Sequence, residues 1–325
     1  MKDSKRNNKK IVAVTGGAGF IGSHLVDELI NSGFKVKVVD NLCIFKKSQD
    51  FFYRNPEAEY YKYDIRVLNP LIRALKGVDT VFHLAALARI QPSLKNPELY
   101  AQVNSLGTMN VLLAAKKAGV RRVIYSSSSS VYGLKNKPPV KEDMSADPLN
   151  PYASTKLAGE YHCRIFSSAF GLETIVLRYF NVYGPRQPDV GQYTPVVAKF
   201  LEQLSRGKPM TIVGDGKLTR SFTYVDDVVQ ANILAMKSKK AGQGEIINIG
   251  SGPNFRYEIN QLAEMIGGEK IKDLLKNKKA IYIPPRPAEI HHSSADISKA
   301  EKILGWQPKI SLEKGLEIMK RHGCG

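Results

Sequence analysis

The chain has 325 residues, of which 43% are hydrophobic and 24% are charged. This balance is that of an ordinary globular protein and excludes a disordered, collagen-like or coiled-coil chain. The length allows about two domains with a large core, so no disulfide or metal staple is needed. The net charge of +18 favours an anionic partner. However, the basic residues are spread along the chain, and a lysine-rich solvated surface explains them better than nucleic-acid binding.

Targeting and metal-binding signals are not visible in the sequence. No apolar run approaches the roughly 20 residues that cross a bilayer, and residues 1–10 are polar and basic, unlike a secretory signal. Cys43, Cys163 and Cys324 show no paired spacing, which argues against a disulfide framework or a cysteine-based zinc site. We therefore expect a cytoplasmic protein with no metal and no membrane partner.

Short apolar runs alternate with helical patterns through the first 180 residues. Strands are predicted at 10–15, 35–40, 59–63, 80–86, 122–126 and 173–177, and helices at 20–31, 67–76, 98–118 and 151–170. Apolar strands separated by helices indicate a parallel sheet covered on both faces, which is a doubly wound α/β fold of Rossmann type. Its ligand crevice lies at the carboxyl ends of the strands.

The pattern changes after Arg178, where proline and glycine become frequent and regular alternation stops. We therefore expect a Rossmann domain over residues 1–180 and a smaller substrate-binding lobe over residues 181–325, with some interleaving of the two.

Three glycines join the first predicted strand to the first predicted helix. Gly16, Gly19 and Gly22 have the spacing of a dinucleotide loop, in which glycine lets backbone N–H groups approach a pyrophosphate at the helix N-terminus. Asp40 ends the second strand, where a carboxylate accepts hydrogen bonds from the adenosine ribose and repels a 2′-phosphate. The pattern predicts NAD rather than NADP.

A second motif opens the predicted helix 151–170. Asn150 and Pro151 resemble an N-cap followed by proline at the first helical position. Tyr152 and Lys156 lie four residues apart, on one face of the helix. We expect the lysine ammonium to lower the pKa of Tyr152 from its usual value of about 10, which makes this tyrosine a usable base.

Five consecutive serines, Ser126–Ser130, follow another predicted strand. At the carboxyl end of a strand their hydroxyls are expected to point into the crevice, where one hydrogen-bonds a substrate hydroxyl beside Tyr152.

With these motifs the chain resembles the extended short-chain dehydrogenase/reductase family, and within it the nucleotide-sugar epimerases. The matching segments run from residue 11 to about residue 316 and include TGGAGFIGSHL (15–25), HLAA (83–86), NPYASTKLAGE (150–160) and LRYFNVYGPRQ (177–187). The resemblance implies a seven-stranded sheet with a C-terminal substrate lobe, NAD as cofactor and a UDP-sugar as substrate.

The resemblance also implies roles for single residues. The positions that match catalytic residues are Ser128, Tyr152 and Lys156. Those that match cofactor contacts are Gly16, Gly19, Phe20, Ile21, Gly22, Asp40, Asn41, Asp64, Ile65, Leu84, Ala85, Ala86, Asn104, Tyr152, Lys156 and Tyr179. Those that match substrate contacts are Ser128, Ser129, Ser130, Tyr152, Asn181, Thr211, Val213, Arg220, Arg286 and Ser293.

The implied reaction inverts C4 of the sugar through a transient 4-keto intermediate. Tyr152 takes the proton of the 4-hydroxyl that Ser128 holds, and hydride passes to NAD and returns to the opposite face. UDP-glucose and UDP-galactose are the expected substrates. The small side chain of Ser293 leaves room for an N-acetyl group, so UDP-N-acetylhexosamines are expected as well.

Three alternatives stay open. A 4,6-dehydratase lacks support, because such relatives resemble Thr-Asp-Glu where this chain has Ser128–Ser130, and elimination needs an acid and a base. A UDP-uronic acid epimerase or decarboxylase is favoured by Arg89, whose guanidinium would face a sugar carboxylate. A non-catalytic NAD-binding regulator is opposed by the intact Ser128, Tyr152 and Lys156.

The predicted helices 98–118 and 151–170 carry apolar residues beyond one face. The resemblance implies that such a pair builds a four-helix interface between two copies, so we expect a homodimer.

Overall fold

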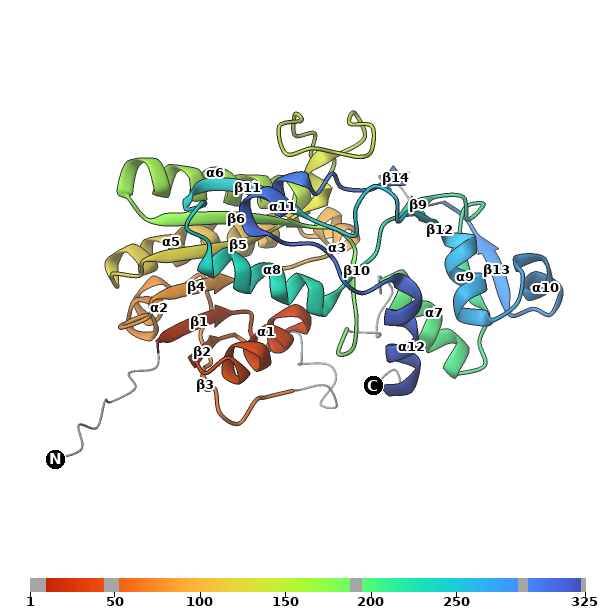
Figure 1. Ribbon diagram of the computed structural model, residues 1–325, viewed down its shortest axis with the longest axis horizontal. Helices are drawn as coiled ribbons and strands as arrows, with labels where there is room; N and C mark the ends of the chain where they lie inside the picture. The colour runs from red at the N-terminus through yellow and green to blue at the C-terminus, as the bar shows by residue number, and fades with distance from the viewer. Residues whose placement is uncertain (1–9, 44–52, 188–194, 286–291, 323–325) are drawn as a thin grey trace.

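Seven parallel strands form the central sheet of the computed structural model, which describes residues 10–43, 53–187, 195–285 and 292–322 (Figure 1). The order across the sheet is β11-β6-β5-β4-β1-β2-β3. The bounds are β1 (Ile11–Thr15), β2 (Lys35–Val39), β3 (Glu59–Tyr61), β4 (Thr80–His83), β5 (Arg122–Ser128), β6 (Glu173–Tyr179) and β11 (Gln243–Ile249). The predicted doubly wound α/β fold is confirmed.

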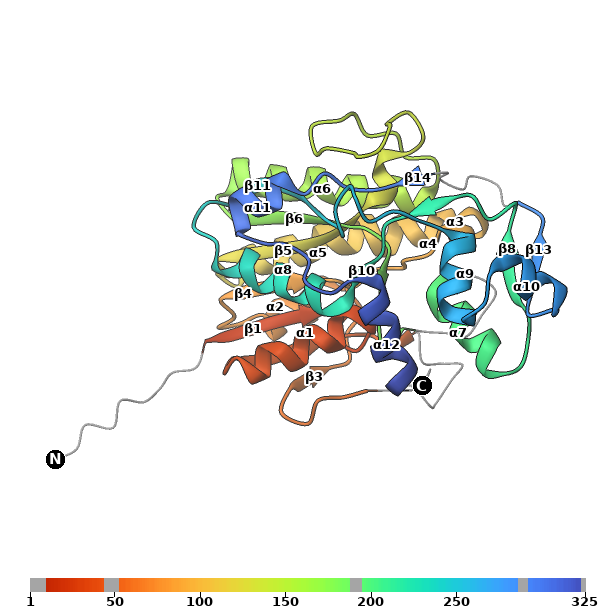
Figure 2. The ribbon, with the colours of Figure 1, turned by 45° about the vertical axis from the view of Figure 1, so that its right-hand side comes forward.

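Helices cover both faces of this sheet (Figures 1 and 2). One face carries α2 (Leu68–Ala74), α5 (Gly107–Lys117) and α6 (Pro151–Phe170), and the other carries α1 (Phe20–Asn31), α8 (Val225–Lys237) and α11 (Ser298–Leu304). Successive strand residues serve opposite faces: Val12 and Val14 pack toward α1, whereas Ala13 packs toward α2. Burial on both faces explains why the strands are continuously apolar.

The predicted helix 98–118 is built differently from the expectation. It consists of α4 (Pro97–Tyr100), a π-helical segment (Ala101–Leu106) and α5. A short helix, α3 (Ile90–Lys95), comes before it, and the predicted strand 80–86 already ends at His83. The segment from Leu84 to Ala86 is therefore a loop at the carboxyl end of β4.

The C-terminal part forms a smaller lobe with its own core, visible on the right of Figure 2. Its helices are α7 (Val196–Ser205), α9 (Ile259–Gly267), α10 (Ile271–Lys276) and α12 (Leu312–His322). Its strand pairs are β8 (Met210–Val213) with β13 (Ala280–Ile283), and β7 (Val182–Tyr183) with β10 (Thr223–Tyr224). A third sheet places β9 (Thr219–Arg220) between β12 (Tyr257–Glu258) and β14 (His292–Ser293).

The central sheet crosses the predicted boundary at residue 180. Strand β11 pairs with β6, and α8 packs on the sheet, although both come later in the chain. The two parts therefore interleave. Within the described ranges, no helix is long and apolar enough to cross a membrane.

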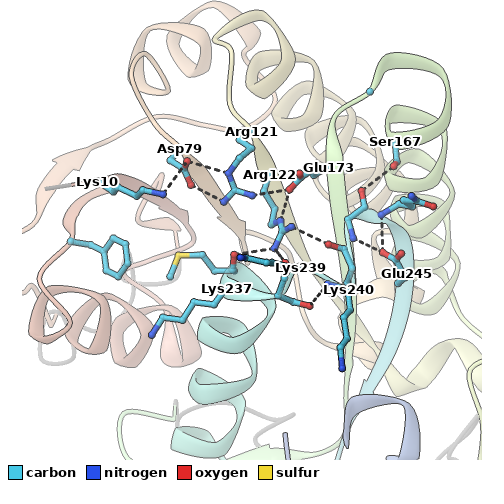
Figure 3. A pocket seen from close by; sticks show the side chains of 17 residues that line it. Lys10, Asp79, Arg121, Arg122, Ser167, Glu173, Lys237, Lys239, Lys240 and Glu245 are labelled. Carbon is cyan, nitrogen blue, oxygen red and sulfur yellow. Dashed lines mark hydrogen bonds and ion pairs between the residues drawn. The ribbon is translucent and has the colours of Figure 1, made fainter. Parts of the chain in front are cut away.

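A cavity of about 880 Å³ lies at the amino-terminal edge of the sheet, opposite the predicted ligand crevice (Figure 3). Arg122 forms part of its wall, with a side chain only 5% exposed. Its guanidinium donates to the carbonyl oxygens of Ala235, Met236 and Ser238 at 2.7–2.9 Å and to that of Ala241 at 3.0 Å. Since the last carbonyls of a helix have no intrahelical partner, Arg122 caps α8 and fixes the loop that follows it.

We expect Arg122→Met to lower the free energy of unfolding by at least about 3 kcal/mol, because several buried carbonyls lose their donor at about 1–3 kcal/mol each. The neighbouring Arg121 is the matched control: its side chain is 40% exposed and pairs with Asp79 and Glu173, so Arg121→Met should cost only about 0–1 kcal/mol. Urea unfolding followed by fluorescence of the single, buried Trp306 measures both. Equal shifts in the two midpoints would contradict the assigned role of Arg122.

Candidate active site

The glycine loop folds as a tight cradle at the carboxyl end of β1. Gly16 has a φ of +74°, and a Cβ there would lie 2.6 Å from the Ala85 nitrogen. A Cβ on Gly22 would lie 2.1 Å from the Gly16 carbonyl oxygen. Helix α1 begins at Phe20 after Gly19, and this glycine N-cap offers no side-chain oxygen to the first-turn N–H groups. These features fit a dinucleotide pyrophosphate.

Asp40 lies at the end of β2, beside this loop. Its carboxylate accepts from the Ala18 N–H at 3.2 Å and from the Leu42 N–H at 2.8 Å. Burial raises its pKa, and these two hydrogen bonds oppose the rise. A carboxylate at this position can accept hydrogen bonds from the ribose hydroxyls of an adenosine.

Two further predicted cofactor residues form one polar cluster next to Asp40. Asn41 donates to Asp64 at 3.0 Å, and Arg66 makes a bidentate ion pair with the same carboxylate. The Arg66 hydrogen bond is the main reason that the pKa of Asp64 falls to about 2. Ile65 is buried against Gly107.

The loop of Leu84, Ala85 and Ala86 runs directly against the glycine cradle. The Leu84 N–H donates to the Thr15 carbonyl oxygen at 3.0 Å. Asn104, in the π-helical segment, holds the next residue of this loop, because its amide bonds both the N–H and the carbonyl of Leu87 at 2.8 and 3.0 Å. It also donates to Thr155 on α6 at 3.1 Å.

The predicted catalytic residues come together at the carboxyl end of β5. Asn150 caps α6 by accepting from the Ala153 N–H at 2.9 Å, which places Tyr152 in the first turn. The Ser128 side chain lies close enough to Tyr152 to lower the pKa of its hydroxyl. Lys156 is buried on the same helix and donates to the Ser126 carbonyl oxygen at 2.7 Å.

The expected effect of Lys156 on Tyr152 is wrong for this arrangement. Burial raises the pKa of Tyr152 above its usual value, and the hydrogen bond with Ser128 opposes that rise. Lys156 instead directs its ammonium to a backbone carbonyl and to the Tyr125 ring, whose centre is 5.1 Å away. Burial also lowers the pKa of Lys156 to about 8.

The five serines do not act as one group. Ser126 and Ser127 point into the core, where they donate to the Tyr179 hydroxyl at 3.0 Å and to Glu160 at 2.5 Å. Ser128 and Ser129 are half-buried at the strand end, and Ser130 donates to the Ser128 hydroxyl at 3.0 Å. Ser128 is thus the serine that reaches both Tyr152 and its own neighbours.

Tyr179 is placed differently from the other predicted cofactor residues. Its hydroxyl also bonds the side-chain amide of Asn232 on α8, at 2.8 and 3.1 Å. The ring therefore packs on the face of the sheet that α8 covers, and only the backbone of Tyr179 lies at the carboxyl end of β6.

Several predicted substrate residues meet at the edge of the small lobe. Asn181 has a φ of +37° and donates to the Ser221 carbonyl oxygen at 2.9 Å. Arg220 pairs in register with Ser293 between strands β9 and β14, and the Ser221 N–H donates to the Ser293 carbonyl oxygen at 3.0 Å. The chain after Ser293 is tied to the loop that follows the serines, because the Val140 N–H donates to the Ser294 carbonyl oxygen at 3.0 Å.

Two of the predicted substrate residues, Thr211 and Val213, lie apart on β8. The Thr211 hydroxyl is occupied by the Gln203 side chain at 3.1 Å, and Val213 is half-buried at the end of its strand. Arg286 lies outside the described residues.

Two buried polar groups beneath the site were not singled out from the sequence. Arg178 makes a bidentate pair with Glu160 at 2.6 and 2.8 Å, with both side chains at most 3% exposed. Glu160 follows Lys156 by four residues, as Lys156 follows Tyr152. The same helical spacing therefore places Glu160 on the face of α6 that carries the other two residues. The second group is the buried His83 of the segment HLAA, with its partners Thr15 and Thr108.

Comparison with known proteins agrees with this geometry. Residues 12–250 match the model of the NAD dependent epimerase/dehydratase family. A UDP-glucose 4-epimerase of Mycolicibacterium smegmatis is 37% identical over 93% of this chain and 95% of its own length. A UDP-glucuronate 4-epimerase of Thermodesulfobacterium geofontis is 37% identical over 94% of this chain and 93% of its own length. The solved UDP-glucose 4-epimerase of Thermotoga maritima with UDP-glucose superposes with a TM-score of 0.87, at 39% identity over 96% of this chain and 98% of its own. The chain therefore belongs to the NAD-dependent epimerase/dehydratase family, and within the extended short-chain dehydrogenases/reductases it is a nucleotide-sugar epimerase.

Proposed function

We propose that this enzyme interconverts UDP-glucose and UDP-galactose by inverting C4. The observation that carries the proposal is the position of Ser128, at the end of β5, beside Tyr152 in the first turn of α6, where the Ser128 side chain opposes the rise that burial causes in the pKa of Tyr152. The Ser128 hydroxyl can relay a proton, and Tyr152 can act as the acid or base. Both residues lie at the edge of the sheet where the glycine cradle lies. The named UDP-glucose 4-epimerases among its relatives support the same sugar.

The chain supplies binding, orientation and proton transfer. Residues of the glycine loop, with Asp40 and the loop 84–86, would hold NAD, which when bound accepts a hydride from C4 and returns it to the opposite face. Ser128 would orient the 4-hydroxyl and pass its proton to Tyr152 in the phenolate form, which becomes the neutral phenol. Asn181 and Arg220 would bind the diphosphate, since a guanidinium suits phosphate oxygens.

A UDP-uronic acid is the second candidate substrate, favoured by Arg89. This side chain is half-buried, and burial lowers its pKa. In the part of the chain that the structure describes, no carboxylate lies within ion-pair distance of it. The Tyr100 hydroxyl accepts from the Arg89 backbone N–H, and the Tyr100 ring lies 6.5 Å from that of Tyr152. A sugar carboxylate beside Tyr152 would give Arg89 a partner, and one relative is named a UDP-glucuronate 4-epimerase.

The test is a substrate panel of UDP-glucose, UDP-galactose and UDP-glucuronic acid, with products identified by NMR. We expect the two hexoses to interconvert with no net consumption of NAD. Tyr152→Phe should lower the turnover number about 10²- to 10⁴-fold, because it removes a positioned acid/base group, while leaving NAD bound. Turnover of UDP-glucuronic acid alone would replace the first candidate by the second. More than a tenth of wild-type turnover in the variant would contradict the role of Tyr152.

N-acetylated sugars provide a finer test of the pocket. If Ser293 lines the wall beside C2, Ser293→Tyr should lower kcat/KM for UDP-N-acetylhexosamines about 5- to 150-fold, because overpacking costs about 1–3 kcal/mol. Turnover of UDP-galactose should change little. Ser293→Ala keeps the space and serves as the control, so its kcat/KM for N-acetylated sugars should stay close to wild type. Equal losses on both sugars would show that Ser293 does not face C2.

We further propose a homodimer built on α6 and the helical run before α5. Tyr161 and Ile165 lie one turn apart on α6 and are 54% and 49% exposed, and Leu99 and Leu106 are 42% and 51% exposed. The two helical runs pack against each other, so these apolar side chains form one surface. A second copy of the same surface would cover it.

Ile165→Glu should convert the dimer to a monomer, because a charge would be buried against apolar side chains. Ile281→Glu is the matched control, since Ile281 is also apolar and 41% exposed but lies on β13 in the other lobe. Light scattering at micromolar concentration should give twice the chain mass for the wild type and the control. A wild-type mass equal to one chain would refute the dimer.

We also place the enzyme in a reducing cytoplasm. This proposal rests on the three cysteines, Cys43, Cys163 and Cys324, whose spacing in the sequence is not that of a disulfide framework.

A further inference from the structure

A chain of buried hydrogen bonds connects the glycine cradle to the catalytic helix, and His83 stands at its centre. This residue is the last of β4 and is 1% exposed. Its Nδ1 lies 2.7 Å from the hydroxyl of Thr15, the last residue of β1, and its Nε2 lies 3.0 Å from the hydroxyl of Thr108 on α5. The reaction as derived above makes no use of this histidine.

The hydrogen atoms of this chain can be assigned from the partners alone. Thr108 lies 2.5 Å from the Asn104 carbonyl oxygen, which has no hydrogen to give, so the Thr108 hydroxyl donates there. Thr108 must then accept from His83, which places a hydrogen on Nε2. In a neutral ring Nδ1 is left bare and accepts from Thr15, whose oxygen in turn accepts from the Ala85 N–H at 3.4 Å.

The surroundings keep the ring neutral. Burial lowers the pKa of His83 to about 3, and the nearby Lys156 ammonium acts in the same direction. The Tyr125 ring lies against the imidazole, with centres 5.6 Å apart. A charged imidazolium would have to donate from both nitrogens, so the bond with Thr15 would reverse and the Thr15 hydroxyl would become the acceptor.

The chain continues from His83 to the residue that carries the proposed base. Asn104, whose carbonyl receives the Thr108 hydrogen, donates its side-chain amide to Thr155 at 3.1 Å. The Thr155 hydroxyl donates to the Tyr152 carbonyl oxygen at 2.9 Å. Four side chains thus connect the end of β1 to the backbone of Tyr152, through the π-helical segment.

We propose that His83, with its hydrogen on Nε2, is a positioning residue that couples the dinucleotide cradle to the first turn of the catalytic helix. This inference rests on the proposed epimerase function, because its effect is read in the position of Tyr152. In the described part of the chain, the His83 ring hydrogen-bonds Thr15 and Thr108 and neither a glycine of the cradle nor Tyr152. It acts through Thr15 on one side and through Thr108 and Asn104 on the other.

Three substitutions at His83 test separately its hydrogen bonds with Thr15 and Thr108. His83→Gln can place an amide N–H near the position of Nε2 and keep the bond to Thr108, whereas His83→Asn can place a carbonyl oxygen near Nδ1 and keep only the bond from Thr15. His83→Phe keeps the ring shape and loses both bonds. We expect His83→Gln to keep most of the wild-type kcat. His83→Asn and His83→Phe should lower kcat about 10- to 100-fold, the scale of a small misplacement of a catalytic group.

Thr108 provides an independent check at the next residue. Thr108→Val is nearly isosteric and removes the hydroxyl, so it should lower kcat as His83→Phe does, and the double variant should lose little more, because both break one chain. Thr108→Ser restores the hydroxyl and should restore kcat. Additive losses in the double variant would overturn the proposed coupling.

Two readouts distinguish positioning from a purely structural role. Since the Ser128 hydrogen bond opposes the rise in the pKa of Tyr152, displacement of Tyr152 should move the acidic limb of the kcat–pH profile to higher pH in His83→Asn and His83→Phe. Nitrogen-15 NMR of the histidines, with His83 assigned by its absence in His83→Gln, should show hydrogen on Nε2 and none on Nδ1 across neutral pH.

A lower melting temperature in the variants, with kcat and its pH profile unchanged, would show that His83 only stabilises the fold and would overturn the proposal. A hydrogen found on Nδ1 would do the same. These results differ from failure of the proposed function, in which the wild-type enzyme itself turns over no UDP-sugar although the NMR assignment of His83 holds.

Discussion

Gly16 and Ala85 bring the ends of β1 and β4 so close together that no side chain fits between them. A Cβ on Gly16 would lie within 3 Å of three atoms of the loop after β4. The strand order reverses at this point of the sheet, with β2 and β3 on one side and β5, β6 and β11 on the other. The contact therefore fixes the two walls of the crevice. The positions of Asn104, of the His83 hydrogen bonds and of Tyr152 all follow from it.

The buried pair of Glu160 and Arg178 shows a second constraint below the site. Taking two charges out of water is costly, and such a pair is favourable only when its remaining donors and acceptors are satisfied. Here Ser127 donates to Glu160, and the Arg178 guanidinium lies over the Tyr132 ring at 4.6 Å, but its Nη1 is buried with no hydrogen-bond partner among the described residues. The pair joins α6 to β6, so the helix with Tyr152 and Lys156 is held in register with the strand ends.

Local signals in the sequence predicted the elements that are fixed locally. Helix α6 begins and ends as expected, because Asn150 caps its start and Gly171 adopts a left-handed conformation at its end. The π-helical segment was not predicted, since it accommodates Asn104 against Leu87 and Thr155, which are distant in the chain. The direction of the Tyr152 pKa shift was predicted wrongly for a similar reason. Spacing along a helix shows that Lys156 is a neighbour of Tyr152. It shows neither the burial of the tyrosine hydroxyl nor the bond from Lys156 to the Ser126 carbonyl oxygen. The substrate side was the least predictable, because Arg220 and Ser293 meet only through pairing of β9 with β14.

The place of β11 in the sheet has a consequence for how the protein is made. This strand pairs with β6, whose other neighbour is β5, and the Tyr179 hydroxyl on β6 needs Asn232 of α8 as a partner. While a ribosome is still synthesising the residues between them, at about 5–20 residues per second, β6 is an open apolar edge of the kind that pairs with other chains. The Rossmann sheet thus cannot close until residue 249 has emerged. For an interval of several seconds, therefore, that edge of the nascent chain has no strand of its own to cover it.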